Sequence, residues 1–260
     1  MPTMVRSGHS GGSPEVMVLP DVAAMASAAG GQAAEVLGNA VDAHGVAHAM
    51  FATGNSQIAF VESLVSRTDV PWSDIVIFHM DEYVGVGPDH PAGFQRWIRE
   101  RITQRARPRT AHYLDGLAPP DQECARYAAL LAEQPLDLCC LGIGENGHLA
   151  FNDPPVAEFE DPLDVKVVEL DAACRRQQVN EGHFVSEADV PTQAMTVTIP
   201  ALLRARRVLA IVPEARKAEP VRQALEGPVD AACPASVLQR TPHATIFLDR
   251  QSAGLLTPRP

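Results

Sequence analysis

The sequence predicts an α/β protein in which a largely parallel sheet is covered by helices on both faces. Three observations support this class. Short apolar runs rich in β-branched residues recur along the chain, and segments with apolar residues at helical spacing alternate with them. No linker and no internal repeat divides the chain, so residues 15–260 are expected to form one domain. Because crossover helices lie on the faces of a parallel sheet, the alternation indicates helices on both sides.

The first expected element is a helix from Asp21 to about Val41. Its apolar residues recur at helical spacing, and Asp21 stands where an N-cap residue is preferred. Gly30 and Gly31 weaken the prediction, because glycine lowers helix propensity. The same spacing predicts later helices over residues 57–65, 93–104, 125–132 and 214–226.

Five short apolar runs are expected to be strands. Each is shorter than a typical helix and consists of residues that suit the interior of a sheet. The runs are residues 46–52, 74–80, 136–141, 207–212 and 244–248.

Composition and charge exclude several classes of protein. The 260 residues are 46% hydrophobic and 20% charged, which is a globular mixture and excludes disorder, a collagen-like repeat and a coiled coil. The 21 Lys and Arg against 32 Asp and Glu give a net charge of −11, which repels a nucleic-acid backbone but allows a local cationic pocket for one phosphate. No apolar run approaches the ~18 residues of a membrane span, so we expect neither nucleic acid nor membrane as partner.

The start of the chain and the cysteines bear on cellular location. Residues 1–14 are rich in Gly and Ser, lack the apolar stretch of a secretory signal and are predicted to be a flexible tail. The cysteines are odd in number and show no CxxC spacing, so neither a disulfide framework nor a zinc ribbon is supported. A reducing cytoplasm fits best. The five cysteines are Cys124, Cys139, Cys140, Cys174 and Cys233.

Functional residues are expected in the loops that follow strands, because ligands of open α/β sheets bind outside the carboxyl ends of the strands. The first such loop is Thr53-Gly54-Asn55-Ser56. Glycine lets the backbone approach an anion, the hydroxyls of Thr53 and Ser56 can donate to phosphate oxygens, and the helix start that follows adds N–H groups. The same residues would also suit an ordinary turn and N-cap.

The second loop follows the strand over residues 74–80 and begins with two adjacent acids, Asp81 and Glu82. Solvated carboxylates are the common explanation for such a pair. However, a carboxylate at the end of an apolar strand is partly desolvated, which raises its pKa and makes it a better proton acceptor near neutral pH. The pair is therefore a candidate for a catalytic base, with a metal ligand as the alternative.

The third loop is the glycine-rich segment 142–154, GIGENGHLAFNDP. It contains GxGxxG, but the dinucleotide fingerprint requires a long helix directly afterwards, and this sequence continues into Asn-Asp-Pro-Pro. The loop presents Asn146, His148 and Asp153 within eight residues. A carboxylate that holds an imidazole forms an acid/base pair, because it fixes the tautomer of the ring. A metal at Asp81 and His148 is the alternative, which no HxxxH or HxH spacing supports.

Taken together, the three loops resemble those of the glucosamine-6-phosphate deaminase family. The family's signatures are a TG-rich phosphate loop, MDEYVG, and GxGx(D/N)GHxxFN, which occur here in the same order at residues 53–56, 80–85 and 142–154. The similarity continues over residues 196–248. The resemblance implies a single-domain, modified Rossmann-like fold. It also implies a deaminating aldose–ketose isomerisation of an amino-sugar phosphate, from glucosamine 6-phosphate to fructose 6-phosphate and ammonia, without a metal or organic cofactor.

The resemblance further implies roles for individual residues. Asp81 resembles the base that moves a proton between C2 and C1, and His148 resembles the group that opens the pyranose ring, assisted by Asn146 and Asp153. A small sugar phosphate is the implied partner, and a homo-oligomer is the implied assembly. The residues implied to bind the substrate, mainly at its phosphate, are Thr53, Gly54, Asn55, Ser56, Glu82, Gly147 and Lys217.

Two departures from the family pattern concern the same site. Asp153 stands where the family usually has Glu, and its side chain is one methylene shorter. An Arg that holds phosphate in many members is matched in register by neither Arg175 nor Arg176. A sugar-phosphate lactonase on the related fold and a non-catalytic sugar-phosphate sensor are therefore the alternatives. Retention of Asp81 and His148 favours an enzyme, whose preferred epimer stays open.

Overall fold

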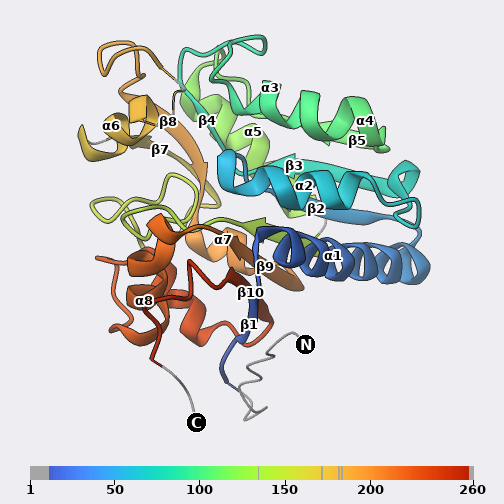
Figure 1. Cartoon of the computed structure of the whole chain (residues 1–260). Helices are drawn as coiled ribbons and strands as arrows, with labels where there is room; N and C mark the ends of the chain where they lie inside the picture. The colour runs from blue at the N-terminus through green and yellow to red at the C-terminus, as the bar shows by residue number, and fades with distance from the viewer. Residues whose placement is uncertain (1–11, 134, 171, 181, 183, 258–260) are drawn as a thin grey trace.

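The structure is a computed structural model that describes residues 12–133, 135–170, 172–180, 182 and 184–257. Its centre is a seven-stranded sheet in the order β1-β10-β9-β6-β2-β3-β5 (Figure 1). Every neighbouring pair in this sheet is parallel, which confirms the predicted α/β class. The strands are β1 (Glu15–Leu19), β2 (Ala47–Phe51), β3 (Ile75–His79), β5 (Thr110–His112), β6 (Leu138–Leu141), β9 (Arg207–Val212) and β10 (Ala244–Asp249).

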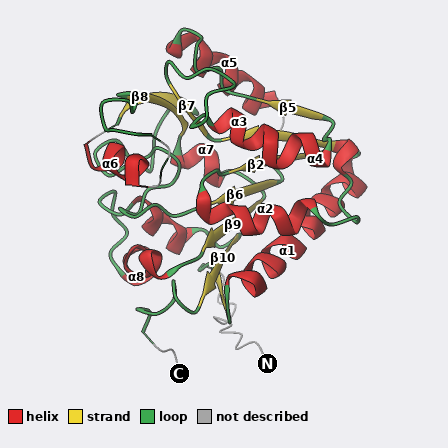
Figure 2. Cartoon of the chain, turned by 45° about the horizontal axis from the view of Figure 1, so that its top comes forward, coloured by secondary structure: helices red, strands yellow, loops and turns green. Residues whose placement is uncertain are grey.

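Helices cover both faces of the sheet, as predicted (Figure 2). None of the helices in the described part of the chain is long and apolar enough to cross a membrane. The helices are α1 (Val22–His44), α2 (Ile58–Val65), α3 (Phe94–Ile98), α4 (Gln104–Ala106), α5 (Pro120–Glu133), α6 (Ala172–Asn180), α7 (Ile199–Leu203) and α8 (Ala218–Glu226).

Alternate residues of the central strands enter two separate hydrophobic cores. Ala49 and Phe51 of β2 pack with α1 and α2, whereas Met50 packs on the opposite face with α5, α7 and α8. The same alternation holds along β3, where Ile77 faces the first core and Phe78 the second. Because successive side chains of a strand point to opposite faces, a strand with apolar residues at every position requires helices on both sides.

Helix α1 begins after Asp21 as predicted and ends at His44, three residues beyond the predicted Val41. Asp21 accepts a hydrogen bond from the backbone N–H of Ala24 at 2.8 Å, and the C-cap is Gly45 with φ of 74°. Gly30, which weakened the prediction, has a packing reason. A Cβ atom at this position would lie 2.8 Å from Oγ of Ser63 in α2, so the glycine allows the two helices to approach closely.

A second, three-stranded antiparallel sheet was not predicted. It has the order β4-β8-β7 and consists of β4 (Asp81–Tyr83), β8 (Gln193–Val197) and β7 (Val165–Glu169). Strand β4 is only three residues long, and β7 carries charged residues, so neither forms an apolar run that sequence periodicity could detect. Strands β1 and β5, and helices α6 and α7, were not predicted either, and α5 begins at Pro120, before the predicted residue 125. Most of the predicted tail, residues 1–14, lies outside the described residues.

The parallel sheet determines where functional loops meet. Strands β3, β2, β6 and β9 lie next to one another in that order, and their carboxyl ends point to the same edge. The loops that follow them are the three singled out in the sequence and a fourth that begins at residue 213. Four segments far apart in the sequence are therefore brought to one edge of the sheet.

Candidate active site

A cavity lies at this edge, between the loops after β2, β3, β6 and β9. Seven of the sequence-predicted residues line it, and they come from all four loops. Four others, Glu82, Asn146, Gly147 and Asp153, lie outside the lining. The seven lining residues are Thr53, Gly54, Asn55, Ser56, Asp81, His148 and Lys217.

The loop after β2 turns into a short 3₁₀ helix, Asn55–Gln57, which continues as α2. Gly54 has φ of 97°, a conformation that favours glycine over all other residues. Gln57 is buried and donates through Nε2 to the backbone oxygen of Ile211 in β9, at 3.1 Å, which ties this loop to the neighbouring strand. Gly54 is the N-cap of the 3₁₀ helix, so the loop also forms the turn and N-cap that its sequence allows.

The loop after β9 repeats this backbone course. Glu214 has φ of 80° and precedes a 3₁₀ helix, Ala215–Lys217, that continues as α8. The N–H of Glu214 donates to Oδ1 of Asp249 at 3.2 Å, which helps to hold the turn. Lys217 is buried at the cavity. The cavity is therefore flanked by two helix starts, each of which follows a residue with positive φ.

Asp81 begins β4 and pairs in register with Thr196 of β8. Its side chain lines the cavity although the residue is buried, and among the described residues no group donates a hydrogen bond to its Oδ1. Burial raises the pKa of Asp81 well above its usual value, and the nearby acids Glu82 and Asp153 raise it further. The prediction of a desolvated carboxylate at this strand end agrees with this environment.

Glu82, the adjacent acid, is buried away from the cavity lining. Its carboxylate accepts backbone N–H groups from Tyr83 at 3.0 Å, Phe94 at 3.1 Å and Gln95 at 2.7 Å. Burial raises its pKa to about 7, against the opposing effect of these hydrogen bonds. Glu82 thus holds the start of α3, and with it Phe94, against the cavity.

The glycine-rich loop brings its three polar residues together. Nδ1 of His148 lies 2.9 Å from Oδ1 of Asp153, and Nδ2 of Asn146 donates to the same oxygen at 2.7 Å. Oδ1 of Asn146 in turn accepts the backbone N–H of His148 at 3.1 Å. Burial alone would raise the pKa of Asp153, but its interactions with His148 and Asn146 outweigh burial and lower the pKa below its usual value.

The glycines of this loop serve side-chain packing. A Cβ atom on Gly144 would overlap the imidazole of His148, so the ring lies in space that only glycine leaves open. Gly147 has φ of 84°, and a Cβ atom there would lie 2.7 Å from Sγ of Cys233. No long helix follows the loop, in agreement with the expectation that its GxGxxG pattern is not a dinucleotide fingerprint.

Two further polar residues line the cavity and were not assigned a role from the sequence. Arg216 forms ion pairs with Glu145 at 3.0 Å and with Glu214 at 2.7 Å. Its position next to Lys217 in the sequence could have indicated that it lies at the site. Gln178 of α6 accepts a hydrogen bond from the hydroxyl of Tyr83 at 2.7 Å. No sequence pattern placed Gln178 at the site, because α6 was not predicted.

The departure from the family pattern around α6 is also visible in the structure. Arg175 donates to the backbone oxygen of Glu187 and does not line the cavity. Arg176 is exposed and does not line it either. Within the described ranges, no group of three or more His, Cys, Asp and Glu side chains is arranged to hold a metal ion.

Comparison with known proteins supports the resemblance that the three loops show. A family model described as glucosamine-6-phosphate isomerases/6-phosphogluconolactonase matches residues 20–247. The glucosamine-6-phosphate deaminase of Listeria innocua is 34% identical over 206 residues, which cover 79% of this chain and 86% of that protein. The enzyme of the same name from Exiguobacterium sibiricum is 33% identical over 207 residues, 79% of this chain and 80% of that protein.

Solved structures share the fold over nearly the whole chain. A monomeric glucosamine-6-phosphate deaminase superposes with a TM-score of 0.83 at 28% identity, over 92% of this chain and 99% of that one. A 6-phosphogluconolactonase from Shewanella baltica superposes with a TM-score of 0.76 at 22% identity, over 91% and 97%, which is a likeness of fold alone. With four strand-end loops around one cavity, and with a family model that matches most of its length, the chain belongs to the glucosamine-6-phosphate isomerase/6-phosphogluconolactonase family.

Proposed function

We propose that this protein converts glucosamine 6-phosphate and water into fructose 6-phosphate and ammonia. The observation that carries the proposal is a pair of carboxylates with opposite shifts in pKa at one cavity. The raised pKa of Asp81 makes its carboxylate a stronger proton acceptor, whereas Asp153 is held ionised beside His148. Two titratable groups whose environments separate their pKa values are the usual arrangement for acid/base chemistry.

His148 is the proposed group for ring opening, which moves a proton from the anomeric hydroxyl to the ring oxygen. Because Asp153 accepts from Nδ1, the neutral ring has its basic nitrogen at Nε2. Nε2 takes the proton from the hydroxyl and returns it to the ring oxygen as the bond between C1 and that oxygen breaks. Asn146 and Asp153 lie behind the ring and act by holding it, so they are positioning residues and need not touch the substrate.

Asp81 is the proposed base for the isomerisation that follows. Its carboxylate takes the proton from C2 of the open-chain sugar while a proton from the ammonium group on C2 passes to O1, which gives an enol intermediate with the amino group still on C2. The protonated carboxyl then delivers a proton to C1, and water replaces the resulting imine at C2 with release of ammonia. A carboxyl whose pKa is raised by burial suits a group that must both accept and donate a proton.

The phosphate is proposed to lie between the two helix starts that flank the cavity. Backbone N–H groups and partial positive charge at a helix start favour an anion, and Thr53 and Ser56 add hydroxyl donors. Lys217, in the loop after β9, is buried at the cavity and supplies positive charge. Glu82 and Gly147 lie outside the cavity lining, so for them we propose a supporting role in shaping the loops rather than contact with the substrate.

The test is to incubate the purified protein with glucosamine 6-phosphate, and separately with its galactosamine and mannosamine epimers, and to measure ammonia. We expect release from one of them, and unchanged release after treatment with EDTA, because every proposed step uses side chains of this chain. Hydrolysis of 6-phosphogluconolactone without ammonia release would instead identify a lactonase. Tight binding of the amino-sugar phosphate without turnover would identify a sensor.

Three further properties are proposed with the function. Residues 15–260 form one domain, since β1 pairs with β10 near the far end of the chain, and limited proteolysis should leave this piece intact. A cytoplasmic location is consistent with five buried cysteines that form no disulfide among the described residues, and cell fractionation tests it. A homo-oligomer remains a prediction that light scattering tests, since the structural relative at 28% identity is a monomeric deaminase.

A further inference from the structure

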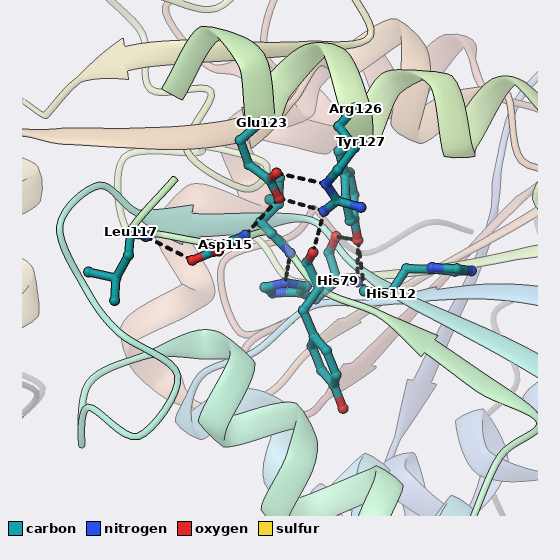
Figure 3. Close-up of polar contacts among 9 residues, drawn as sticks. His79, His112, Asp115, Leu117, Glu123, Arg126 and Tyr127 are labelled. Atoms are coloured by element: carbon teal, nitrogen blue, oxygen red, sulfur yellow. Dashed lines mark hydrogen bonds and ion pairs between the residues drawn. The ribbon is translucent and has the colours of Figure 1, made fainter. Parts of the chain in front are cut away.

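The proposed mechanism does not use His79, although this residue ends β3 two positions before Asp81. Its ring is fully buried and lies between two tyrosines, with ring centroids 5.8 Å from Tyr113 and 6.3 Å from Tyr127. Figure 3 shows it among side chains of the loop before α5 and of α5 itself. A buried imidazole so near the proposed base requires an explanation.

The protonation state of His79 follows from its contacts. The backbone N–H of Leu114 donates to Nε2 at 2.9 Å, so Nε2 carries the lone pair and the neutral ring carries its proton on Nδ1. Burial lowers the pKa of His79 to about 3, which keeps the ring neutral near physiological pH. The two groups that favour its charged form are the backbone of Asp81 and the carboxylate of Glu123. The ring therefore ties the loop at Leu114 to the end of β3, and its Nδ1 has no hydrogen-bond partner among the described residues.

Tyr127 holds the backbone of His79 from the other side. Its hydroxyl accepts the N–H of His79 at 3.0 Å and lies 2.7 Å from the carbonyl oxygen of the same residue, to which it donates. The carbonyl oxygen of His112 lies 3.2 Å from this hydroxyl (Figure 3). Because Phe78 and His112 are the last register pair of β3 and β5, the hydroxyl continues the connection between the two strands beyond their ladder.

The loop that contacts His79 also contacts the chain after Asp81. Glu123 accepts the N–H of Asp115 at 2.7 Å and is paired with Arg126, which fixes this loop against α5. The carbonyl oxygen of Gly116 then accepts the N–H of Gly85 at 2.7 Å. A Cβ atom on Gly116 would overlap backbone oxygens of the segment 83–86, so the two segments are in direct contact. Residues 114–116 thus hold the chain on both sides of Asp81.

We propose that His79 and Tyr127 are positioning residues that fix the backbone at Asp81 and so aim its carboxylate into the cavity. The proposal rests on the proposed function, because Asp81 must be the base for its aim to matter. No described residue donates a hydrogen bond to Oδ1 of Asp81. The orientation of this carboxylate oxygen therefore depends on the position of the backbone. Misplacement of a reacting group by about 1 Å costs roughly 10²-fold in rate.

The first experiment compares Tyr127→Phe with Tyr113→Phe. Both changes remove one buried or half-buried hydroxyl beside His79, but the hydroxyl of Tyr113 pairs with Oγ1 of Thr103, at 3.1 Å, and not with β3. We expect kcat of folded Tyr127→Phe to fall roughly 10-fold to 100-fold with KM unchanged, and Tyr113→Phe to keep the wild-type kcat. A purely structural role would lower the melting temperature of Tyr127→Phe and leave its kcat unchanged, and this result would overturn the proposal.

The second experiment compares two replacements of His79. The side-chain oxygen of Gln reaches about as far as Nε2 and can accept the N–H of Leu114, whereas Phe fills the space and cannot. We expect His79→Gln to keep several-fold more of the wild-type kcat than His79→Phe. If His79→Phe does not fold, His79→Gln is compared with the wild type and with Tyr127→Phe, and it should lie between them. Equal wild-type values of kcat in His79→Gln and Tyr127→Phe would contradict the proposal.

A measurement without turnover separates this proposal from the proposed function. The carboxyl of Asp81 can be titrated by ¹³C NMR, with its signal assigned by its loss in Asp81→Asn. The charged groups near it, Glu82 and Asp153 with His148 and Lys217 at the cavity, are the same in both tyrosine variants. We expect the pKa of Asp81 to fall towards its usual value in Tyr127→Phe, because a loosened carboxylate gains water, and to stay unchanged in Tyr113→Phe.

The two ideas can then fail independently. Wild-type protein that releases no ammonia from any of the three amino-sugar phosphates contradicts the proposed function. In that case the titration alone decides whether Tyr127 positions Asp81: a lowered pKa in Tyr127→Phe supports the proposal, and an unchanged pKa overturns it. Active wild-type protein with an unaffected Tyr127→Phe variant contradicts only the positioning role.

Discussion

The short strand that begins with Asp81 and the glycine-rich loop that carries Asp153 each place a carboxylate at the same site, with opposite results. Both residues are buried, yet the pKa of Asp153 is lowered while that of Asp81 is raised. Asp153 accepts a hydrogen bond from Asn146 and pairs with His148, whereas no described residue donates to Oδ1 of Asp81, which lies near two other acids. Burial raises the pKa of both carboxylates, and hydrogen-bond partners reverse the shift only at Asp153.

The largest expected effect is the loss of turnover in Asp81→Asn. Asn has the same shape but cannot accept the proton from C2, and loss of a general base commonly costs ~10²-fold to 10⁴-fold in rate. We expect ammonia release to fall in this range, with inhibition by inorganic phosphate unchanged. Near-normal ammonia release from the pure variant would remove Asp81 from the role of base and end the contrast between the two carboxylates.

Asp153→Ala should reduce the rate by a different route, roughly 10²-fold with the cyclic substrate. The change removes the group that holds His148 and so impairs ring opening, while the proton transfer at Asp81 is left intact. An open-chain substrate analogue that is blocked from ring closure should therefore react at nearly the wild-type rate. Rates of both compounds are compared in the variant and in the wild type, and an equal loss for the two would contradict the ring-opening role of this pair.

Asp153→Glu, which restores the residue usual in the family, sharpens the comparison further. Oδ1 of Asp153 already accepts from Asn146 at 2.7 Å and lies 2.9 Å from Nδ1 of His148, in a buried position. An added methylene has little space there and should displace the carboxylate, so we expect about a tenfold loss in kcat. Higher activity than the wild type would show instead that the loop has not adapted to the shorter acid.

The smallest expected effects concern the pH dependence of stability, where the two sites should differ in sign. A raised pKa in the folded state means that the contribution of Asp81 to stability falls as the pH rises above 3.8, its usual value. A lowered pKa means that Asp153 stabilises the fold above 3.8 and loses this contribution as the pH falls through its lowered pKa.

Urea unfolding of the Asn variants over a range of pH tests these signs. Relative to the wild type, Asp81→Asn should become more stable as the pH rises from about 4 towards neutrality. Asp153→Asn should become less stable at lower pH, as the pH rises through the lowered pKa of Asp153 to about 4, and its deficit should then stay constant. Differences of the same sign in the two variants would mean that the two environments are not opposed.

Local sequence patterns were sufficient for much of the fold and for part of the site. The strands over residues 207–212 and 244–248 and the capped helix after Asp21 were predictable, because apolar periodicity and N-capping act within a few residues. The cluster of Asn146, His148 and Asp153 was predictable for the same reason, since its members lie within eight residues. Strand β4 was not, because a three-residue strand exists only through its pairing with β8, more than a hundred residues later.

What the sequence determined by itself is the α/β class, the loops that carry function and the residue types available in them, because these depend on spacing along the chain. Only the tertiary structure decided which of those residues share a cavity, since β3 and β9 reach the same sheet edge through long-range pairing. It also decided that Glu82 holds α3, and that within the described part of the chain Oδ1 of Asp81 has no hydrogen-bond partner. The proton affinity of a carboxylate is set by groups that surround it in space. Two acids that are adjacent in the sequence can therefore have different surroundings and different roles.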